Sequence, residues 1–156
     1  MVNDYRFILA DCHALFRDGV RGILEGKPDL KIIGEASDAS ELLGLLKQAA
    51  PDLVLLDISM PEFRGIKSIP EIKEIHPEVK ILVMAMHKDR EYLHQAISAG
   101  ADGYLLKQDA ASDLFSAIEI IRQGGVYVPW NVKGPALKKS VSVSKGPKTQ
   151  YSPSRK

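Results

Sequence analysis

The stretch that decides the fold is Leu53–Pro61, LVLLDISMP, in which four consecutive apolar residues lead directly into an aspartate. Similar apolar runs occur at residues 5–10, 31–36, 80–86 and 103–107. Near-continuous apolar runs, unlike alternating ones, indicate strands that are buried on both faces, as in a parallel sheet covered by helices. The chain is therefore expected to contain five buried strands.

Between the expected strands, apolar residues recur with helical spacing. The first such segment has one apolar face, made of Leu15, Phe16, Val20, Ile23 and Leu24. Comparable faces follow in four later segments, at residues 42–50, 66–75, 92–97 and 114–121. Since parallel strands require right-handed helical crossovers, the predicted fold class is α/β, a (βα)5 doubly wound parallel five-stranded sheet.

Composition is typical of a soluble globular protein. The 156 residues are 45% hydrophobic and 26% charged, and no apolar stretch approaches the roughly 20 residues that a membrane-spanning helix needs. The opening residues MVNDYRF show no basic segment followed by an apolar run, so no secretory signal is expected. The single cysteine cannot form an internal disulfide, which suits a reducing compartment. We therefore expect a cytoplasmic protein that does not enter a membrane.

Polar residues follow the expected strands where each strand ends. Asp11, Cys12 and His13 follow the first strand, Asp57 ends the third, and Lys107 ends the fifth. In doubly wound sheets, ligands bind beyond the carboxyl ends of the strands. Carboxylates from adjacent strands can hold Mg²⁺, and a carboxylate beside that ion can attack a phosphoryl group. The pattern predicts one site at this edge of the sheet.

Four longer segments resemble a known family. They are LADCHALFRDGVRGIL (9–24), PDLVLLDISMPEFRGI (51–66), ILVMAMHKDREYLHQAISAGADGYLLK (81–107) and GGVYVP (124–129). Together they resemble the receiver domain of two-component response regulators, of the LuxR/NarL type. The resemblance implies a flavodoxin-like receiver domain over residues 1–129. It also implies a transcriptional regulator, not an enzyme, that accepts a phosphoryl group from a histidine kinase to control dimerisation and DNA binding.

The resemblance assigns a role to each matching residue. Asp57 matches the phosphoacceptor, and Lys107 matches the lysine that contacts the phosphoryl oxygens. Asp11, Asp57 and the backbone carbonyl of Ser59 match ligands of Mg²⁺. Tyr104 matches the aromatic residue that changes position when the domain is activated.

Two positions depart from the family pattern. Cys12 stands where the family has a second acid that contacts Mg²⁺, and a thiol is a soft ligand that removes one negative charge. Ala85 stands where a Ser or Thr normally donates a hydrogen bond to the phosphoryl group. The Mg²⁺ site is therefore expected to be weakened or lost. Two interpretations remain open, a receiver phosphorylated on Asp57 and a degenerate receiver that serves as a protein-interaction or dimerisation module.

Other classes of site are less well supported. A reactive thiol or zinc site at Cys12 and His13 is disfavoured, because adjacent residues rarely present their side chains to each other and only one cysteine is available. A phosphatase of the haloacid-dehalogenase type needs a second acid where this chain has Ser59. A nucleotide-binding fold needs a glycine-rich first loop, which the chain lacks.

The C-terminal residues differ in composition from the rest of the chain. Residues 131–156 contain seven Lys or Arg and no Asp or Glu, so residues 130–156 are expected to form a basic, flexible linker. The last residues, YSPSRK (151–156), resemble the opening of the helix-turn-helix domain found in this subfamily. We therefore expect that the natural protein continues into that domain and contacts DNA only through it, the alternative being a stand-alone receiver.

Dimerisation is the output step that the resemblance implies. The family pairs either through its first and fifth helices or through a face built from the fourth helix, fifth strand and fifth helix. In this chain those surfaces include Arg90, Tyr92, His94 and Gln95 and the segment Ile118–Gln123. The sequence leaves the choice of surface open.

Overall fold

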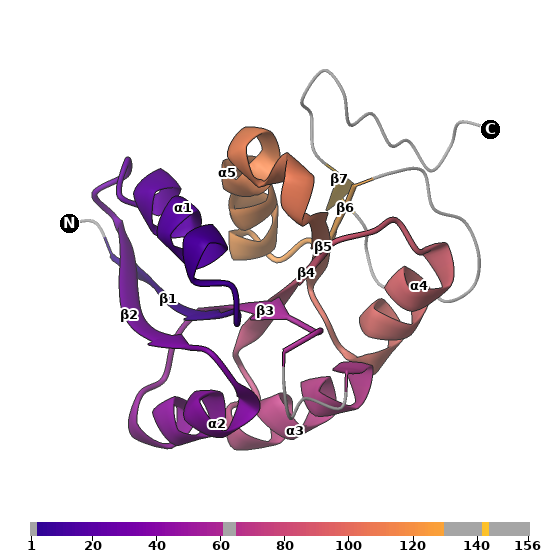
Figure 1. Ribbon diagram of the computed structural model, residues 1–156, viewed down its shortest axis with the longest axis horizontal. Helices are drawn as coiled ribbons and strands as arrows, with labels where there is room; N and C mark the ends of the chain where they lie inside the picture. The colour runs from indigo at the N-terminus through magenta and orange to yellow at the C-terminus, as the bar shows by residue number, and fades with distance from the viewer. Residues whose placement is uncertain (1–2, 61–64, 130–141, 144–156) are drawn as a thin grey trace. The chain divides into compact units, whose positions relative to one another are not determined.

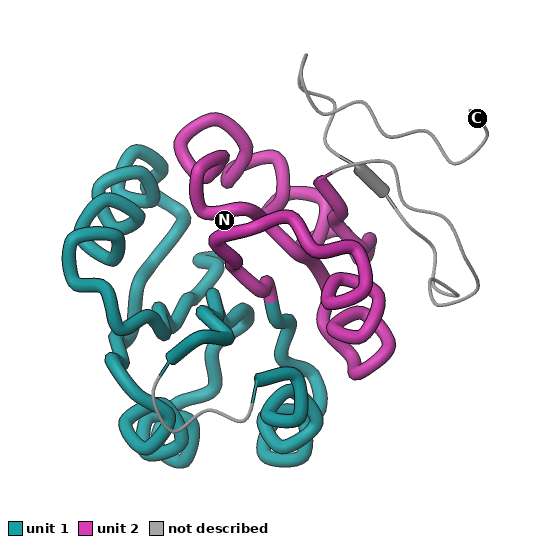
Figure 2. The backbone as a smooth tube through the Cα atoms, turned by 45° about the vertical axis from the view of Figure 1, so that its right-hand side comes forward, with its two compact units in different colours: residues 1–81 teal, residues 82–156 magenta. Residues whose placement is uncertain are grey.

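The computed structural model describes residues 3–60, 65–129 and 142–143 (Figure 1). The chain divides into two compact units, residues 1–81 and residues 82–156 (Figure 2). All five expected strand–helix pairs are present in the expected order, and each expected strand begins and ends within one residue of its predicted bounds. The α/β prediction is confirmed.

In the first unit, the central strand is β1, which pairs in parallel with β2 on one side and β3 on the other. Helix α1 lies on one face of these strands, and α2 and α3 lie together on the opposite face (Figure 1). The elements are β1 (Tyr5–Ala10), α1 (Ala14–Leu24), β2 (Leu30–Ala36), α2 (Ala39–Gln48), β3 (Leu53–Asp57) and α3 (Ser68–Ile75).

In the second unit, β5 pairs in parallel with both β4 and β6, and β6 pairs with β7. Helices α4 and α5 lie on opposite sides of β5 (Figure 1). Strands β6 and β7 were not predicted, because a strand of two residues is too short to show a periodic pattern. The elements are β4 (Lys80–Ala85, whose first two residues belong to the first unit), α4 (Arg90–Ala99), β5 (Gly103–Leu106), α5 (Ala110–Arg122), β6 (Tyr127–Val128) and β7 (Ser142–Val143).

Local signals in the sequence fix several helix ends. The carboxylate of Asp38 accepts a hydrogen bond from the backbone N–H of Glu41 at 2.8 Å and so caps the start of α2. The carboxylate of Asp89 caps α4 in the same way, through the N–H of Tyr92 at 3.0 Å. Helix α4 ends at Gly100, whose φ of 119° is a left-handed conformation that glycine adopts without strain.

The core face of α1 differs from the prediction at Leu15. Val20 and Leu24 are buried as expected, but the side chain of Leu15 is 85% exposed. A helix turns by about 100° per residue, so Leu15 points roughly 140° away from Val20, whereas Phe16 is only about 40° from it. The predicted core position of Leu15 is therefore wrong.

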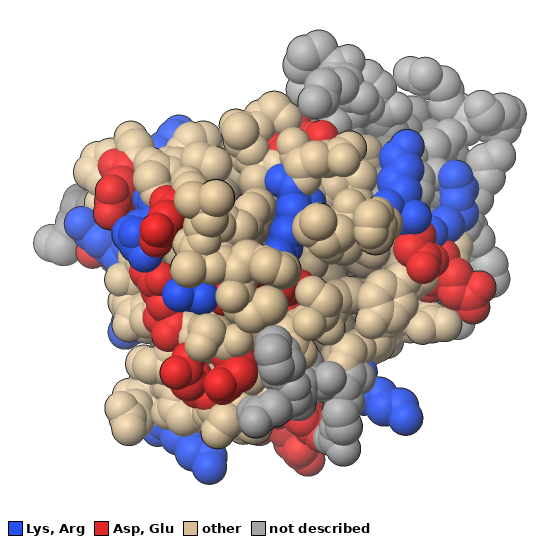
Figure 3. All heavy atoms as spheres, in the orientation of Figure 1, with Lys and Arg blue, Asp and Glu red and all other residues tan. Residues whose placement is uncertain are grey.

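A charged cluster links α1 to β2. The carboxylate of Glu35 accepts hydrogen bonds from Arg17 Nε at 3.1 Å and from Arg21 Nε and a terminal nitrogen of Arg21 at 2.8 and 3.0 Å. The bonds from Arg21, followed by those from Arg17, hold the pKa of Glu35 below its usual value. Acidic and basic side chains accordingly lie next to each other over α1 and β2, at the left of Figure 3.

Glu35→Gln is expected to lower the free energy of unfolding by about 1 kcal/mol at neutral pH, because a two-pronged arginine–carboxylate contact is lost. The folded-state pKa of Glu35 lies below 4.5, so its contribution is present above pH 4.5 and disappears as the pH falls through the folded value. The difference between variant and wild type should therefore shrink below that pH in urea unfolding curves. Glu25→Gln, at an exposed position, is the control, and an equal loss in both variants would contradict the assignment.

Candidate functional site

The register of the first unit brings two aspartates together. Ala10 of β1 lies opposite Leu56 of β3, so the next residues, Asp11 and Asp57, leave adjacent parallel strands at the same level. The N–H of Asp11 donates to the carbonyl of Ala36 at 2.9 Å, which continues the pairing with β2 by one residue. Both aspartates are 1% exposed. The predicted meeting of these two carboxylates beyond the strand ends is confirmed.

The carboxylate of Asp57 has a defined orientation. Its Oδ1 accepts hydrogen bonds from the N–H of Ser59 at 3.0 Å and from the hydroxyl of Ser59 at 2.7 Å, as in the turns that Asp commonly forms with the residue two positions later. The other oxygen, Oδ2, faces the loop after β1. It lies 4.0 Å from Cys12 Sγ and 3.7 Å from His13 Nδ1.

The loop Asp11–His13 folds its three side chains toward one another. Asp11 Oδ1 accepts a hydrogen bond from the N–H of His13 at 2.7 Å and lies 3.1 Å from His13 Nδ1. Cys12 Sγ lies 3.9 Å from both ring nitrogens of His13. Arg17 holds the loop from α1 by donating a hydrogen bond to the carbonyl of Asp11.

This arrangement differs from the expectation that Cys12 and His13 do not meet. His13 is the N-cap residue of α1, with an extended backbone, and its side chain makes no capping hydrogen bond to the helix. Its ring contacts Asp11 instead, which brings it beside the thiol. The sequence placed His13 with Asp11 and Cys12 at the end of the first strand, but the family resemblance assigned no role to it.

The remaining predicted positions belong to the second unit. Ala85 is the last residue of β4, Tyr104 lies within β5, and Lys107 follows the end of β5. All three are buried, with exposed fractions of 8%, 0% and 8%. Burial, with smaller contributions from Asp89 and Tyr92, raises the pKa of Tyr104 to about 12, so its hydroxyl stays protonated at neutral pH.

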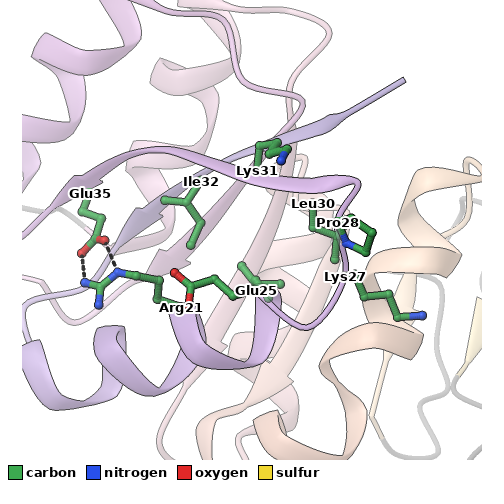
Figure 4. Close-up of a pocket in the computed structure, with 9 residues that line it drawn as sticks. Arg21, Glu25, Lys27, Pro28, Leu30, Lys31, Ile32 and Glu35 are labelled. Atoms are coloured by element: carbon green, nitrogen blue, oxygen red, sulfur yellow. Dashed lines mark hydrogen bonds and ion pairs between the residues drawn. The ribbon is translucent and has the colours of Figure 1, made fainter. Parts of the chain in front are cut away.

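A separate hollow of about 350 Å³ lies between the C-terminal half of α1 and β2 (Figure 4). The hollow extends to Leu30 at the start of β2, whereas the loop after β1 lies near the other end of that strand. No residue of the predicted site lines it. Its lining residues are Arg21, Leu24, Glu25, Lys27, Pro28, Leu30, Lys31, Ile32 and Glu35.

None of the helices in the described part of the chain is long and apolar enough to cross a membrane.

Comparison with known proteins gives one consistent result. Residues 7–119 match the model of the response regulator receiver domain. The transcriptional regulatory protein DegU of Brevibacillus brevis is 34% identical over 81% of this chain and 53% of its own length. The chain thus spans about half the length of the curated relatives it matches.

Two solved structures extend the likeness to three dimensions. A LuxR-family response regulator from Aurantimonas sp. SI85-9A1 has a TM-score of 0.73 at 33% identity, covering 78% of this chain and 87% of that one. The isolated receiver domain of RcsB from Salmonella enterica serovar Typhimurium, studied with a phosphomimetic, has a TM-score of 0.76 at 29% identity and covers 81% and 94%. These neighbours have the flavodoxin-like fold, so the chain belongs to the response-regulator receiver domains of the LuxR/NarL type.

Proposed function

We propose that this chain is the signal-receiving domain of a transcriptional regulator and that Asp57 accepts a phosphoryl group from a histidine kinase. The observation that carries the proposal is the Asp57 carboxylate itself. It ends a buried strand, Ser59 fixes one of its oxygens, and the carboxylate of Asp11 leaves the adjacent strand at the same level. A nucleophile held in one orientation avoids an entropic cost at the moment of reaction.

In the proposed transfer, a carboxylate oxygen of Asp57 attacks phosphorus and forms an acyl phosphate. The phosphorus–nitrogen bond to the kinase histidine breaks, and the displaced imidazole takes up a proton from solvent. The ammonium group of Lys107 would contact the phosphoryl oxygens and compensate their charge. Tyr104, which lies on β5 three residues before Lys107, would change position when the phosphoryl group binds.

The residues present fit a Mg²⁺ ion, although less well than an all-oxygen site would. Receiver domains generally bind this ion at an acidic pocket, and here Asp11, Asp57 and the carbonyl of Ser59 would supply oxygen ligands. When bound, Mg²⁺ supplies positive charge that offsets the negative oxygens of the transferring group. Cys12 at the position of the second acid lowers the negative charge of the site by one, so we expect weakened Mg²⁺ binding.

A second candidate function follows from Cys12 and Ala85, the two residues that depart from the family pattern. Ala85 has no hydroxyl with which to hold the phosphoryl group, and Cys12 offers no hard ligand. Under this alternative the domain is a degenerate receiver that acts through protein interaction and dimerisation without a phosphorylation switch.

The output is proposed by analogy with longer relatives. Phosphorylation in the cytoplasm would favour a homodimer, through α1 and α5 or through the face of α4, β5 and α5. DNA would be bound through a C-terminal helix-turn-helix domain joined by the basic linker. The linker proposed for residues 130–156 lies outside the described residues, apart from β7.

Incubation with acetyl phosphate and millimolar Mg²⁺ tests the proposal. Intact-mass spectrometry should show the addition of one phosphoryl group, and Asp57→Asn should abolish it. Asp4→Asn, at an exposed position before β1, should leave the label unchanged. No label at saturating donor, or a label that survives Asp57→Asn, would favour the degenerate receiver.

A further inference from the structure

Four side chains that can ligate metals converge in the first unit. Asp11, Cys12, His13 and Asp57 each offer one ligand atom, and all four atoms lie within 4.8 Å of one another. The donors come from two segments, the loop after β1 and the end of β3. They include two oxygens, one nitrogen and one sulfur, so the cluster is chemically unlike a group of acids alone.

The distances in this cluster are close to those of a tetrahedral site. Bonds of about 2.0–2.3 Å to Zn²⁺ place neighbouring ligand atoms roughly 3.3–3.7 Å apart. His13 Nδ1 lies 3.1 Å from Asp11 Oδ1 and 3.7 Å from Asp57 Oδ2. Cys12 Sγ lies 3.9 Å from His13 Nδ1 and 4.0 Å from Asp57 Oδ2. Each of these four pairs therefore needs to change by only about half an ångström or less, and the other two pairs lie within 4.8 Å.

The chemistry of the donors selects the class of metal. Mg²⁺ takes oxygen ligands in an octahedron and keeps several waters, so thiol and imidazole do not suit it. Zn²⁺ and the neighbouring transition metals bind thiolate and imidazole well and accept four ligands. The two carboxylates are buried, and the side chain of His13 is 54% exposed, which leaves the cluster accessible from solvent.

We propose that Asp11, Cys12, His13 and Asp57 form a binding site for Zn²⁺ or a similar transition metal, with the Cys12 thiol proton released to solvent. Metal binding stands on the geometry alone, and its consequence for signalling rests on the proposed function. The metal would bind Oδ2 of Asp57, while Oδ1 accepts hydrogen bonds from the N–H and the hydroxyl of Ser59. A bound Zn²⁺ would therefore compete with transfer of the phosphoryl group to the same carboxylate.

Titration of the metal-free full chain with Co²⁺ tests the site, because Co²⁺ occupies such sites and absorbs visible light. Binding at the cluster should give the intense visible bands of tetrahedral Co²⁺ and a near-ultraviolet thiolate-to-cobalt band. Stoichiometric Zn²⁺ should abolish both, and millimolar Mg²⁺ should not. Since Cys12 is the only cysteine, bound Zn²⁺ should also slow its reaction with a thiol reagent.

Two variants and one control test Cys12 and His13 as ligands. Cys12→Ser should remove the near-ultraviolet band, and His13→Ala should weaken Co²⁺ binding by more than about tenfold, since even loss of an outer partner of a metal ligand costs about 10–100-fold. His87→Ala, which removes an exposed histidine outside the cluster, is the matched control. A spectrum without the thiolate band, or one unchanged in Cys12→Ser, overturns the site.

Different measurements test the proposed metal site and the proposed phosphorylation of Asp57. The cobalt spectrum does not depend on any phosphodonor, and labelling of Asp57 is measured with Mg²⁺ alone. Absence of the label with an intact cobalt spectrum contradicts the proposed phosphorylation and supports the metal site. A label without the cobalt bands contradicts the metal site and supports the phosphorylation.

Discussion

The double substitution Cys12→Asp with Ala85→Thr is expected to raise the affinity for beryllofluoride by about one to two powers of ten in the presence of Mg²⁺. It restores the family's residue type at both atypical positions. Beryllofluoride with Mg²⁺ mimics a phosphoryl group bound to the carboxylate of Asp57. Under the proposed function, a threonine hydroxyl at position 85 would donate a hydrogen bond to the charged group, which contributes about 1.5–3 kcal/mol. An aspartate at position 12 would return an oxygen ligand and one negative charge to the proposed Mg²⁺ site.

The affinity can be followed by the fluorescence of a dye attached away from the site or by nuclear magnetic resonance. Each single variant should give part of the gain, and Cys12→Asp alone should lower the Mg²⁺ concentration needed for half-maximal binding. Adding Asp57→Asn to the double variant should remove binding altogether. A double variant no better than wild type would show that positions 12 and 85 are not what limits this receiver.

Cys12→Asp also couples this prediction to the proposed metal site. The same substitution replaces a soft ligand by a hard one, so it should shift the cluster from Zn²⁺ toward Mg²⁺. Loss of the thiolate-to-cobalt band and a gain in Mg²⁺ affinity are therefore expected in one variant. A gain in Mg²⁺ affinity without loss of that band would show that Cys12 was not ligating Co²⁺.

The sequence was sufficient to predict most of the fold, because its signals are local and repeated. The apolar run Leu53–Leu56 is continuous, and β3 forms there with every residue buried. Asp38 and Gly100 act at helix ends, where the requirement for a cap or a positive φ depends on the nearest residues. Leu15 was placed wrongly, because it was counted with the apolar face although a turn of about 100° per residue places it roughly 140° from Val20.

The site was only partly predictable, for a different physical reason. The carboxyl ends of parallel strands meet at one edge of the sheet, and this is enough to predict that Asp11 and Asp57 lie close together. The position of the His13 ring depends on side-chain torsions and on the contact with Asp11, which no spacing in the sequence specifies. For that reason the convergence of Cys12 and His13 on Asp57 Oδ2 emerges only from the structure.

Gly103, in the second unit, is closely surrounded at the point where a side chain would begin. A Cβ at this residue would lie 2.8 Å from Leu82 Cδ1, 2.9 Å from Ile121 Cδ1 and 3.3 Å from Tyr127 Cβ. These atoms belong to β4, α5 and β6, so the contact is made on three sides. The two methyl groups are at the ends of side chains and can yield, but the Cβ of Tyr127 is fixed to the backbone of a strand paired with Gly103.

Gly103→Ala is therefore expected to lower the free energy of unfolding by about 1–3 kcal/mol, and Gly103→Val by more, because each added methyl overpacks a dense core. Gly44→Ala is the matched control, since Gly44 lies within α2 and its added Cβ would meet nothing within 4 Å. That change should raise the free energy of unfolding by about 0.5–1 kcal/mol, because alanine favours helix and glycine does not. The same chemical substitution should thus have opposite signs at the two sites in urea or thermal unfolding. Equal effects would show that the crowding around β5 relaxes without cost and that packing at Gly103 does not limit the stability of the second unit.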